Sequence, residues 1–307
     1  MTLVSRTASA PRAQALGQAM VLMSATAFGT LAIFAKLGYA NGLGTQQLLA
    51  FRFVLAALGM AAVAFLLGQN ILRLRRKDVA ILLAMGGLLY TVQSLTYFLA
   101  LRTLPASLVV LIAYIYPSLV VVAGWLFLHR SIAAWHLVAL MASFAGVAML
   151  VGGARFQISW ALVLAVTSPV VYTGYILVGE RVMGTAPALA ASAVIMMGAA
   201  LGFSLLALLT GQLSAPSSMP GWSICVGIAL VPTMFAISLF LAALPRVGSA
   251  RAALLSTWEP VVTVILAVVL LRDRLSWIQV IGGFLVLLAV VSVQMSRPLK
   301  LVEPPPG

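Results

Sequence analysis

The amino-acid sequence predicts an all-α membrane protein of ten transmembrane helices, arranged as two inverted repeats of five helices. Three observations support this prediction: an apolar composition, ten apolar stretches long enough to span a bilayer, and landmarks that recur at a constant displacement. Of 307 residues, 63% are hydrophobic and 7% are charged, against about 45–50% and about 25% in soluble domains. So few polar residues cannot cover the surface of a protein in water, and most of the surface must therefore face lipid.

The ten stretches satisfy the length requirement of a bilayer, whose hydrocarbon core of about 30 Å takes about 20 helical residues to cross. The segments between them are short and rich in Gly, Asn, Pro, Ser and basic residues, so consecutive helices should be antiparallel neighbours. The predicted spans are Leu16–Leu37, Thr45–Gly68, Val79–Leu101, Pro105–Leu128, Ile132–Gly152, Ile158–Gly179, Ala186–Thr210, Gly221–Leu244, Ser249–Leu271 and Leu275–Met295.

The basic residues give the predicted orientation. A net charge of +13 does not indicate a nucleic-acid partner, because Lys and Arg lie mainly at the ends of apolar stretches rather than in a patch with interleaved aromatics. Lys and Arg concentrate in cytoplasmic loops, and a cytoplasmic N-terminus gives that side most of them, including Arg73, Arg75, Arg76 and Lys77 in one loop. We therefore expect both termini in the cytoplasm. Short loops without added domains favour a bacterial inner membrane.

The two halves of the chain share landmarks at a nearly constant displacement, close to half the length of the chain. Phe98–Ala100 recurs as Phe240–Ala242, Ser107 as Ser249, Pro117 as Pro260, and Trp135 as Trp277. Because five is odd, the second copy must enter the membrane in the opposite sense. The predicted organisation is a cytoplasmic tail (1–15), a first repeat (16–152), a second repeat (158–295) and a second cytoplasmic tail (296–307). Inverted repeats are typical of transporters whose substrate site lies near the bilayer midplane.

Three short segments and the five-plus-five organisation carry a resemblance to a known family. The segments are Leu49–Phe53 with Arg52 inside it, Trp258–Val261 and Leu271–Ser276. Over about Gln18 to Val293 the chain resembles the EamA-type branch of the drug/metabolite transporter (DMT) superfamily. The first repeat departs from the pattern, with Tyr116-Pro117 where the family often has Glu-Pro.

The resemblance implies a secondary transporter that exports small metabolites by alternating access. Tyr114–Leu119, together with Tyr172 and Tyr175, look most like the aromatic amino acid exporters of this family. Aromatic or other apolar amino acids, or related amphipathic compounds, are therefore the expected substrates.

Two charges are expected inside the membrane. Glu259 lies about ten residues into its span, hence about 15 Å deep, where an ionised group costs at least about 2.5–3.5 kcal/mol unless it meets a partner, water or substrate. It is interpreted as a proton-titrating or amine-binding carboxylate, or alternatively as a structural group bonded to backbone freed by prolines. Arg52, about 10 Å into its span, is the candidate counterion; pinning helices, snorkelling or binding a substrate carboxylate are its alternative roles.

Four prolines within spans are predicted hinges or kinks: Pro117, Pro169, Pro232 and Pro260. Each removes one backbone donor and frees the carbonyl four residues earlier. Such carbonyls survive in a membrane only if buried in protein or facing a wet cavity. The kinked helices should line one central cavity or supply the hinges of gating, with simple packing kinks as the alternative.

Polar and aromatic stripes predict the walls of that cavity. A largely neutral, tyrosine-rich pocket suits an apolar or aromatic solute with a few polar groups. The predicted lining residues are Thr26, Thr30, Tyr90, Gln93, Ser94, Tyr97, Tyr114, Tyr116, Ser168, Tyr172, Tyr175, Trp258 and Glu259.

Other functional classes fit the residues less well. A channel or a lipid-flipping protein is the main alternative. An intramembrane enzyme is less favoured, because the five acidic residues are scattered rather than clustered for metal or acid–base chemistry. Only His129 and His136 are available as histidine ligands, so no metal site is expected. Without a nucleotide-binding motif, no cofactor or ATP is expected to act within this chain. Proton antiport and uncoupled facilitation are the two open modes of transport.

Overall fold

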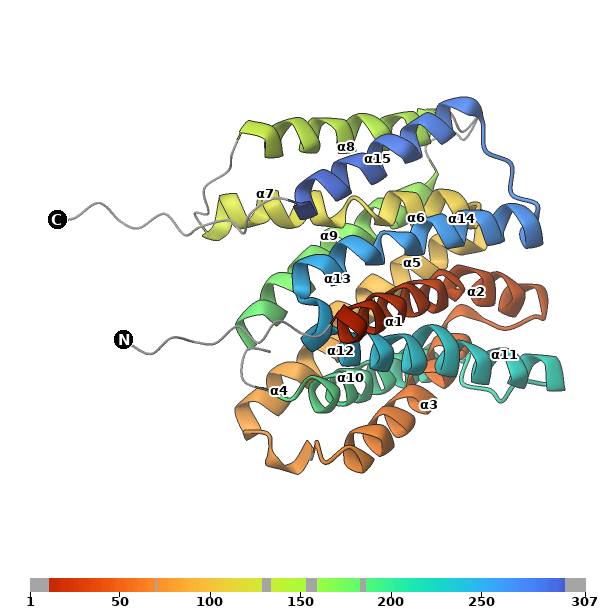
Figure 1. The fold of residues 1–307 in the computed structure, drawn as a ribbon. Helices are drawn as coiled ribbons and strands as arrows, with labels where there is room; N and C mark the ends of the chain where they lie inside the picture. Colours follow the sequence, from red (N-terminus) through yellow and green to blue (C-terminus); the bar gives the residue numbers. More distant parts are fainter. Residues whose placement is uncertain (1–10, 70, 129–133, 153–158, 183–185, 296–307) are drawn as a thin grey trace, which may run out of the picture.

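The computed structural model describes residues 11–69, 71–128, 134–152, 159–182 and 186–295, and every regular element in these ranges is a helix (Figure 1). The first repeat contains α1 (Pro11–Gly29), α2 (Leu31–Ala40), α3 (Thr45–Leu66), the short 3-10 helix η1 (Ile71–Arg73), α4 (Arg76–Ala84), η2 (Met85–Tyr90), α5 (Thr91–Thr103), α6 (Ala106–Ala113), α7 (Tyr116–Leu128) and α8 (Ala134–Gly152). The second contains α9 (Trp160–Val182), α10 (Ala188–Leu209), α11 (Met219–Ala229), η3 (Leu230–Phe235), α12 (Ala236–Val247), α13 (Ser249–Ser256), α14 (Trp258–Leu271) and α15 (Trp277–Met295).

The predicted helical membrane architecture is confirmed, with one difference in the count of spans. Nine helical segments in the described ranges are long and apolar enough to cross a membrane, and a further apolar helix at Leu137–Val151 is shorter. That helix corresponds to the predicted fifth span, Ile132–Gly152, whose first two residues lie outside the described part. The structure therefore supports nine of the ten predicted spans by length.

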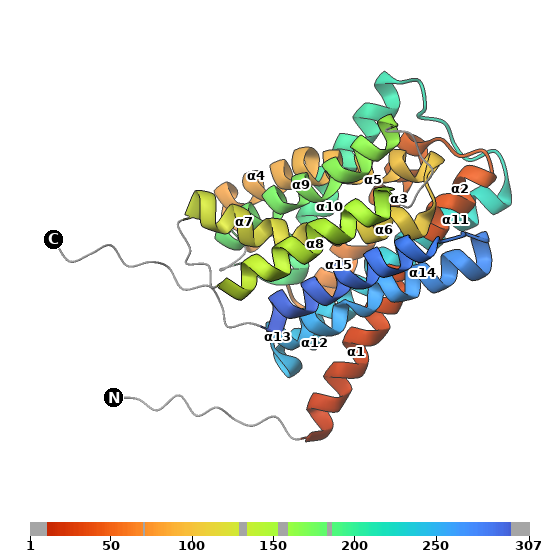
Figure 2. The same cartoon turned by 90° about the horizontal axis from the view of Figure 1, so that it is seen from above.

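Equivalent helices of the two repeats pack against each other in pairs. The most extensive contacts join α3 to α10 and α8 to α15, and α1 packs on α12 as α9 packs on α5. Figure 2 shows α8 and α15 side by side along one edge of the bundle. The α1–α12 pairing therefore recurs as α9–α5, whereas α3–α10 and α8–α15 each join a helix to its own counterpart.

The paired helices run antiparallel. Phe53 of α3 stacks on Phe203 of α10 with ring centroids 5.3 Å apart. Ala64, near the end of α3, shares a buried cluster with Leu189, near the start of α10. Likewise Gln279, early in α15, donates a hydrogen bond of 3.3 Å to a carbonyl late in α8. An antiparallel relation between equivalent helices is the arrangement that an inverted repeat requires.

The prolines interrupt the spans in different ways. Pro117 is the second residue of α7 and Pro260 the third of α14, so these two spans are broken into separate half-helices. Pro169 lies inside the continuous α9. Pro232 lies in η3, a π-helical turn. Whether these breaks act as hinges stays a prediction.

The π-helical turns η2 and η3 were not predicted. Thr91 donates its hydroxyl to the Gly86 carbonyl, and Thr233 donates to the Ile228 carbonyl, each over 2.8 Å and five residues back. The two motifs occupy equivalent positions of the two repeats, since their displacement along the chain equals that of Ser107 and Ser249. π-Helical turns are often found at functional sites.

Glycines allow α8 and α15 to pack closely. A Cβ on Gly282 of α15 would lie 2.6 Å from the Gly146 carbonyl of α8, and a Cβ on Gly146 would meet the Gly282 carbonyl at the same distance. Backbone atoms cannot move aside as a side-chain end can. The α8–α15 pair therefore depends on these two glycines.

We expect Gly282→Ala to lower the midpoint of thermal unfolding in detergent, because the added methyl group forces α8 and α15 apart, at a cost of about 1–3 kcal/mol. Gly174→Ala in α9 is the matched control, since a Cβ there meets nothing within 4 Å and alanine favours the helix by about 1 kcal/mol. Equal midpoints for the two variants would contradict this role of Gly282.

Candidate functional site

A cavity of about 330 Å³ lies between the two repeats. Spans from both repeats contribute to it, and its wall combines aromatic rings, hydroxyl groups, one guanidinium group and one carboxylate. The lining residues are Phe28, Leu31, Arg52, Tyr90, Gln93, Ser94, Tyr97, Phe98, Val110, Ala113, Tyr114, Tyr116, Ser168, Pro169, Tyr172, Phe240, Ser256 and Glu259.

Most residues predicted for the cavity come together in this wall. Both intramembrane charges are among them. The predicted lining residues found there are Tyr90, Gln93, Ser94, Tyr97, Tyr114, Tyr116, Ser168, Tyr172 and Glu259. The sequence interpretation missed Phe28, Phe98 and Phe240, because it followed polar and tyrosine stripes. That the predicted lining residues bind a solute stays a prediction.

Four predicted residues do not line the cavity. Thr26 and Thr30 donate their hydroxyls to carbonyls of the same chain segment, at Leu22 and Ala27, a local bond common for threonine in helices. Trp258 is 43% exposed and donates its indole N–H to Thr26 over 3.2 Å. Trp258 is the first residue of α14, next to the break between α13 and α14 at Thr257.

Tyr175, the fourth of these residues, lies behind the cavity wall. Its ring stacks on Tyr172 at 5.6 Å and contacts Tyr90 at 5.4 Å. Tyr116 meets Tyr172 edge to face at 4.9 Å. Tyr175 thus supports an aromatic wall whose inner rings face the cavity, since edge-to-face and offset-stacked pairs are the favoured geometries of aromatic contact.

Arg52 is almost fully buried, at 2% exposure. Its Nε donates to the Thr233 hydroxyl over 3.0 Å, and its guanidinium carbon lies 4.6 Å from the Phe53 ring centroid and 5.6 Å from that of Phe98. The ion pair found in the described ranges joins Arg75 to Asp78, at the start of α4. Arg52 therefore reaches the cavity without a carboxylate partner among the residues described.

Thr233 connects this charge to the backbone opened by Pro232. The Ile228 carbonyl, four residues before the proline, accepts the Thr233 hydroxyl proton, and the same hydroxyl oxygen accepts the Arg52 Nε–H. One hydroxyl therefore satisfies a freed carbonyl and positions a buried cation. Its counterpart Thr91 makes the carbonyl bond, and the recurrence of threonine at equivalent positions of the two repeats was the sequence signal for it.

Glu259 is held from the opposite repeat. The Tyr114 hydroxyl lies 3.0 Å from Glu259 Oε2 and 3.1 Å from the Ser256 carbonyl. That carbonyl is the one freed by Pro260. The single phenol proton is thus shared between a proline-freed carbonyl and an intramembrane carboxylate, whereas Thr233 donates to its carbonyl and accepts from Arg52.

Neutral hydrogen bonds join α5 to α9 in the wall of the cavity. Gln93 donates its side-chain amide to the Ser168 hydroxyl over 3.2 Å, and Ser168 donates to the Gln93 carbonyl over 3.3 Å. Ser94 donates to the Gln93 side-chain oxygen over 3.2 Å. These three side chains place polar groups on an otherwise aromatic wall.

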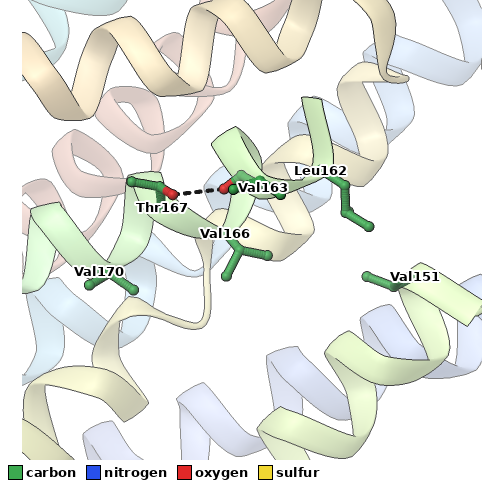
Figure 3. A pocket seen from close by; sticks show the side chains of 6 residues that line it. All are labelled: Val151, Leu162, Val163, Val166, Thr167 and Val170. Carbon is green, nitrogen blue, oxygen red and sulfur yellow. Dashed lines mark hydrogen bonds between the residues drawn. The ribbon is translucent and has the colours of Figure 1, made fainter. Parts of the chain in front are cut away.

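A second hollow of about 450 Å³ lies between α8 and α9. Figure 3 shows Val151 of α8 facing Leu162, Val163, Val166 and Val170 of α9. The hydroxyl of Thr167 is already donated to the Val163 carbonyl over 2.8 Å. Because this apolar groove offers no polar group to orient a solute, the cavity between the repeats is the better candidate site.

Comparisons with known proteins agree with this architecture. The EamA-like transporter family matches the chain twice, over residues 15–152 and 159–295. The chain is thus a multi-pass membrane transporter of the DMT superfamily. The chain belongs to the EamA-like transporter family, in which each repeat is one copy of the family domain.

One solved structure, described as "Crystal structure of protein", is similar to this chain with a TM-score of 0.64 and 20% sequence identity, covering 92% of this chain and 97% of that one. At this identity the similarity shows a shared fold alone. A search of curated proteins finds no match.

We expect Thr233→Val to lower thermal stability, because it leaves both Arg52 Nε and the Ile228 carbonyl without their partner, at a cost of about 1–3 kcal/mol. Thr91→Val is the matched control, since Thr91 makes the equivalent bond to a carbonyl and does not hold Arg52 in place. The measurement is the unfolding midpoint of both single variants, of Arg52→Met and of the double variant Arg52→Met with Thr233→Val. Strictly additive effects in the double variant would contradict the Arg52–Thr233 contact.

Proposed function

We propose that this protein is a secondary transporter that exports small metabolites by alternating access. The proposed substrates are amino acids with aromatic or other apolar side chains, or related amphipathic compounds. The observation that supports this best is the cavity itself, in which a buried guanidinium group and a carboxylate face the same space without forming an ion pair with each other.

The two charges match the two ends of a zwitterion. A charge in a low-dielectric site is costly unless it is paired and hydrogen-bonded. A substrate carboxylate against Arg52 and a substrate ammonium against Glu259 would pair both. Arg52 has one of its nitrogen donors engaged by Thr233, and the guanidinium group has further donors for a carboxylate.

The aromatic wall fits the rest of such a molecule. Tyr116 and Tyr172 share the lining with both charged groups and present ring surface, and Phe28, Phe98 and Phe240 add apolar area. Rings of this kind bind apolar or aromatic side chains by offset or edge-to-face contact. The expected substrate is therefore charged at one end and apolar at the other.

The membrane arrangement is part of the proposal. We place the chain in a bacterial inner membrane with both termini in the cytoplasm, on the basis of the distribution of basic residues. Opposite insertion of the repeats is supported by the antiparallel α3–α10 and α8–α15 pairs. Export, rather than uptake, rests on the resemblance to exporters.

We expect purified protein to be stabilised against thermal unfolding by phenylalanine more than by phenylalanine amide, phenethylamine or phenylpropionate, each of which lacks one charge of the zwitterion. Arg52→Lys and Glu259→Gln should each raise the phenylalanine concentration needed for the same stabilisation by about tenfold or more. The reason is that a hydrogen bond to a charged group is worth about 1.5–3 kcal/mol. Tyr175→Phe, behind the wall, is the control and should match the parent.

Stabilisation only by charged sugars or nucleotides would overturn the assigned substrate class. Counterflow in proteoliposomes separates the transporter from the alternatives: unlabelled substrate inside should accelerate entry of labelled substrate, and the rate should saturate. Entry that rises linearly with concentration, without acceleration, would favour a channel.

A role in proton coupling makes a separate prediction for Glu259, the carboxylate among the cavity-lining residues. In proteoliposomes, an imposed pH gradient should accelerate substrate movement by the parent protein. Glu259→Gln should abolish this response, because glutamine carries no titrating proton. A variant that keeps the response of the parent would exclude Glu259 as the coupling group, and Glu180→Gln, at the end of α9, serves as the control.

A further inference from the structure

The half-helices α6 and α13 are equivalent in the two repeats, but they are buried to different extents. Ser107 in α6 corresponds to Ser249 in α13. All residues from Ala106 to Ile112 of α6 are buried. Of the α13 side chains that the structure describes, Ala252 is the buried one, and the others are partly or fully exposed. The bundle is therefore closed around α6 and more open around α13.

The difference lies in the helices that pack against each half-helix. α6 packs on α14, whereas no comparable packing joins α13 to α7, the counterpart of α14, in the described part of the chain. Figures 1 and 2 show α6 next to α14, and α7 apart from α13. Three further neighbours correspond, since α6 contacts α5, α8 and α9, and α13 contacts their counterparts α12, α15 and α1. The half-helix α6 also contacts α2, and no comparable packing joins α13 to α9 in the described ranges.

The α6–α14 pair is joined at both ends. At the cavity end, Tyr114 donates to Glu259. At the far end, Asp273 Oδ2 accepts the Ser107 backbone N–H over 3.0 Å and the Ser107 hydroxyl over 2.9 Å. A carboxylate at a helix N-terminus satisfies an otherwise unpaired N–H and interacts favourably with the helix dipole.

The chain turns so that Asp273 can reach α6. Arg272, just past the end of α14, has φ of 57°, the left-handed conformation that ends many helices. The Asp273 N–H then bonds to the Ala267 carbonyl over 3.1 Å. The carboxylate therefore extends from the loop after α14 in one repeat to the half-helix α6 of the other.

The equivalent carboxylate is absent from the sequence of the other repeat. With Trp135 aligned to Trp277, the position corresponding to Asp273 is Ser131. Residue 131 lies outside the described ranges, so the comparison is one of sequence alone. Serine carries no charge to hold the N-terminus of α13 against α7 in the opposite conformation.

We propose that Asp273 is a positioning residue of the transport cycle: it latches α6 onto α14, keeps the α6 side of the cavity closed, and must release Ser107 before that side opens. This inference rests on the proposed alternating access. Because the other repeat has no charged latch, the protein without substrate favours the conformation that is closed around α6.

The test measures access to the cavity from each face of the membrane. In a Cys225→Ala background, the cavity-lining Ala113→Cys is labelled with a membrane-impermeant thiol reagent in right-side-out and in inverted vesicles. Asp273→Ala should increase labelling by about tenfold from the membrane face on which the N-terminus of α6 lies, and should decrease labelling from the opposite face. This is the result expected when a contact that stabilises one of the two conformations is removed.

Matched variants separate the latch from general effects. Asp78→Ala removes a carboxylate whose partner, Arg75, is in the same repeat, and should label like the parent. Ser107→Ala removes one of the two hydrogen bonds and should have a smaller effect; added to Asp273→Ala it should change nothing further. Should Asp273→Ala fail to fold, Asp273→Asn, which keeps an acceptor without the charge, should show an intermediate increase.

Unchanged labelling in the Asp273 variants, or an equal increase in Asp78→Ala, would overturn the latch. Labelling requires no substrate, so its outcome is separate from that of the transport assays. If Asp273→Ala alters the labelling but the parent protein transports no amino acid, the role of Asp273 is supported and the proposed substrates are rejected. Normal transport with unaltered labelling would reject the latch alone.

Discussion

In the hydrocarbon core of a membrane, every backbone polar group and every charge must find its partner inside the protein. Here this constraint links the prolines to the charges. The Thr233 hydroxyl donates to the carbonyl freed by Pro232 and accepts from Arg52. The Tyr114 hydroxyl shares its one proton between the carbonyl freed by Pro260 and Glu259. The breaks in the helices and the charged groups of the cavity therefore form two connected networks rather than four independent features.

Each network joins the two repeats. Arg52 belongs to α3 of the first repeat and bonds to η3 of the second; Glu259 belongs to α14 of the second and bonds to the end of α6 in the first. The scaffold is close to symmetric, but the charges are not. The stretch of α10 that packs against α3 is apolar, and Tyr116 precedes the proline of the first repeat where Glu259 precedes that of the second. A symmetric scaffold thus supports a cavity with distinct ends.

Much of the fold could be predicted from the sequence, because span length and the constant displacement between repeated landmarks are properties of composition and order alone. The depth of Glu259 likewise predicted that it would face the interior, whereas for Arg52 snorkelling to the interface was an open alternative. The π-helical turns were missed because helical periodicity assumes regular hydrogen bonding, although threonines recur at positions 91 and 233. Thr26 and Trp258 do not line this cavity: Thr26 donates its hydroxyl to the Leu22 carbonyl, and Trp258 donates its indole N–H to Thr26. Such hydrogen bonds do not follow from the order of residues alone.

The central claim is that Arg52 and Glu259 are held apart by their own networks so that a zwitterion can lie between them. An experimental structure with bound phenylalanine tests it most directly. The account predicts the substrate carboxylate against the Arg52 guanidinium group, its ammonium against Glu259, and its ring among the tyrosines. A direct Arg52–Glu259 ion pair, or phenylalanine bound in the apolar groove between α8 and α9, would contradict it.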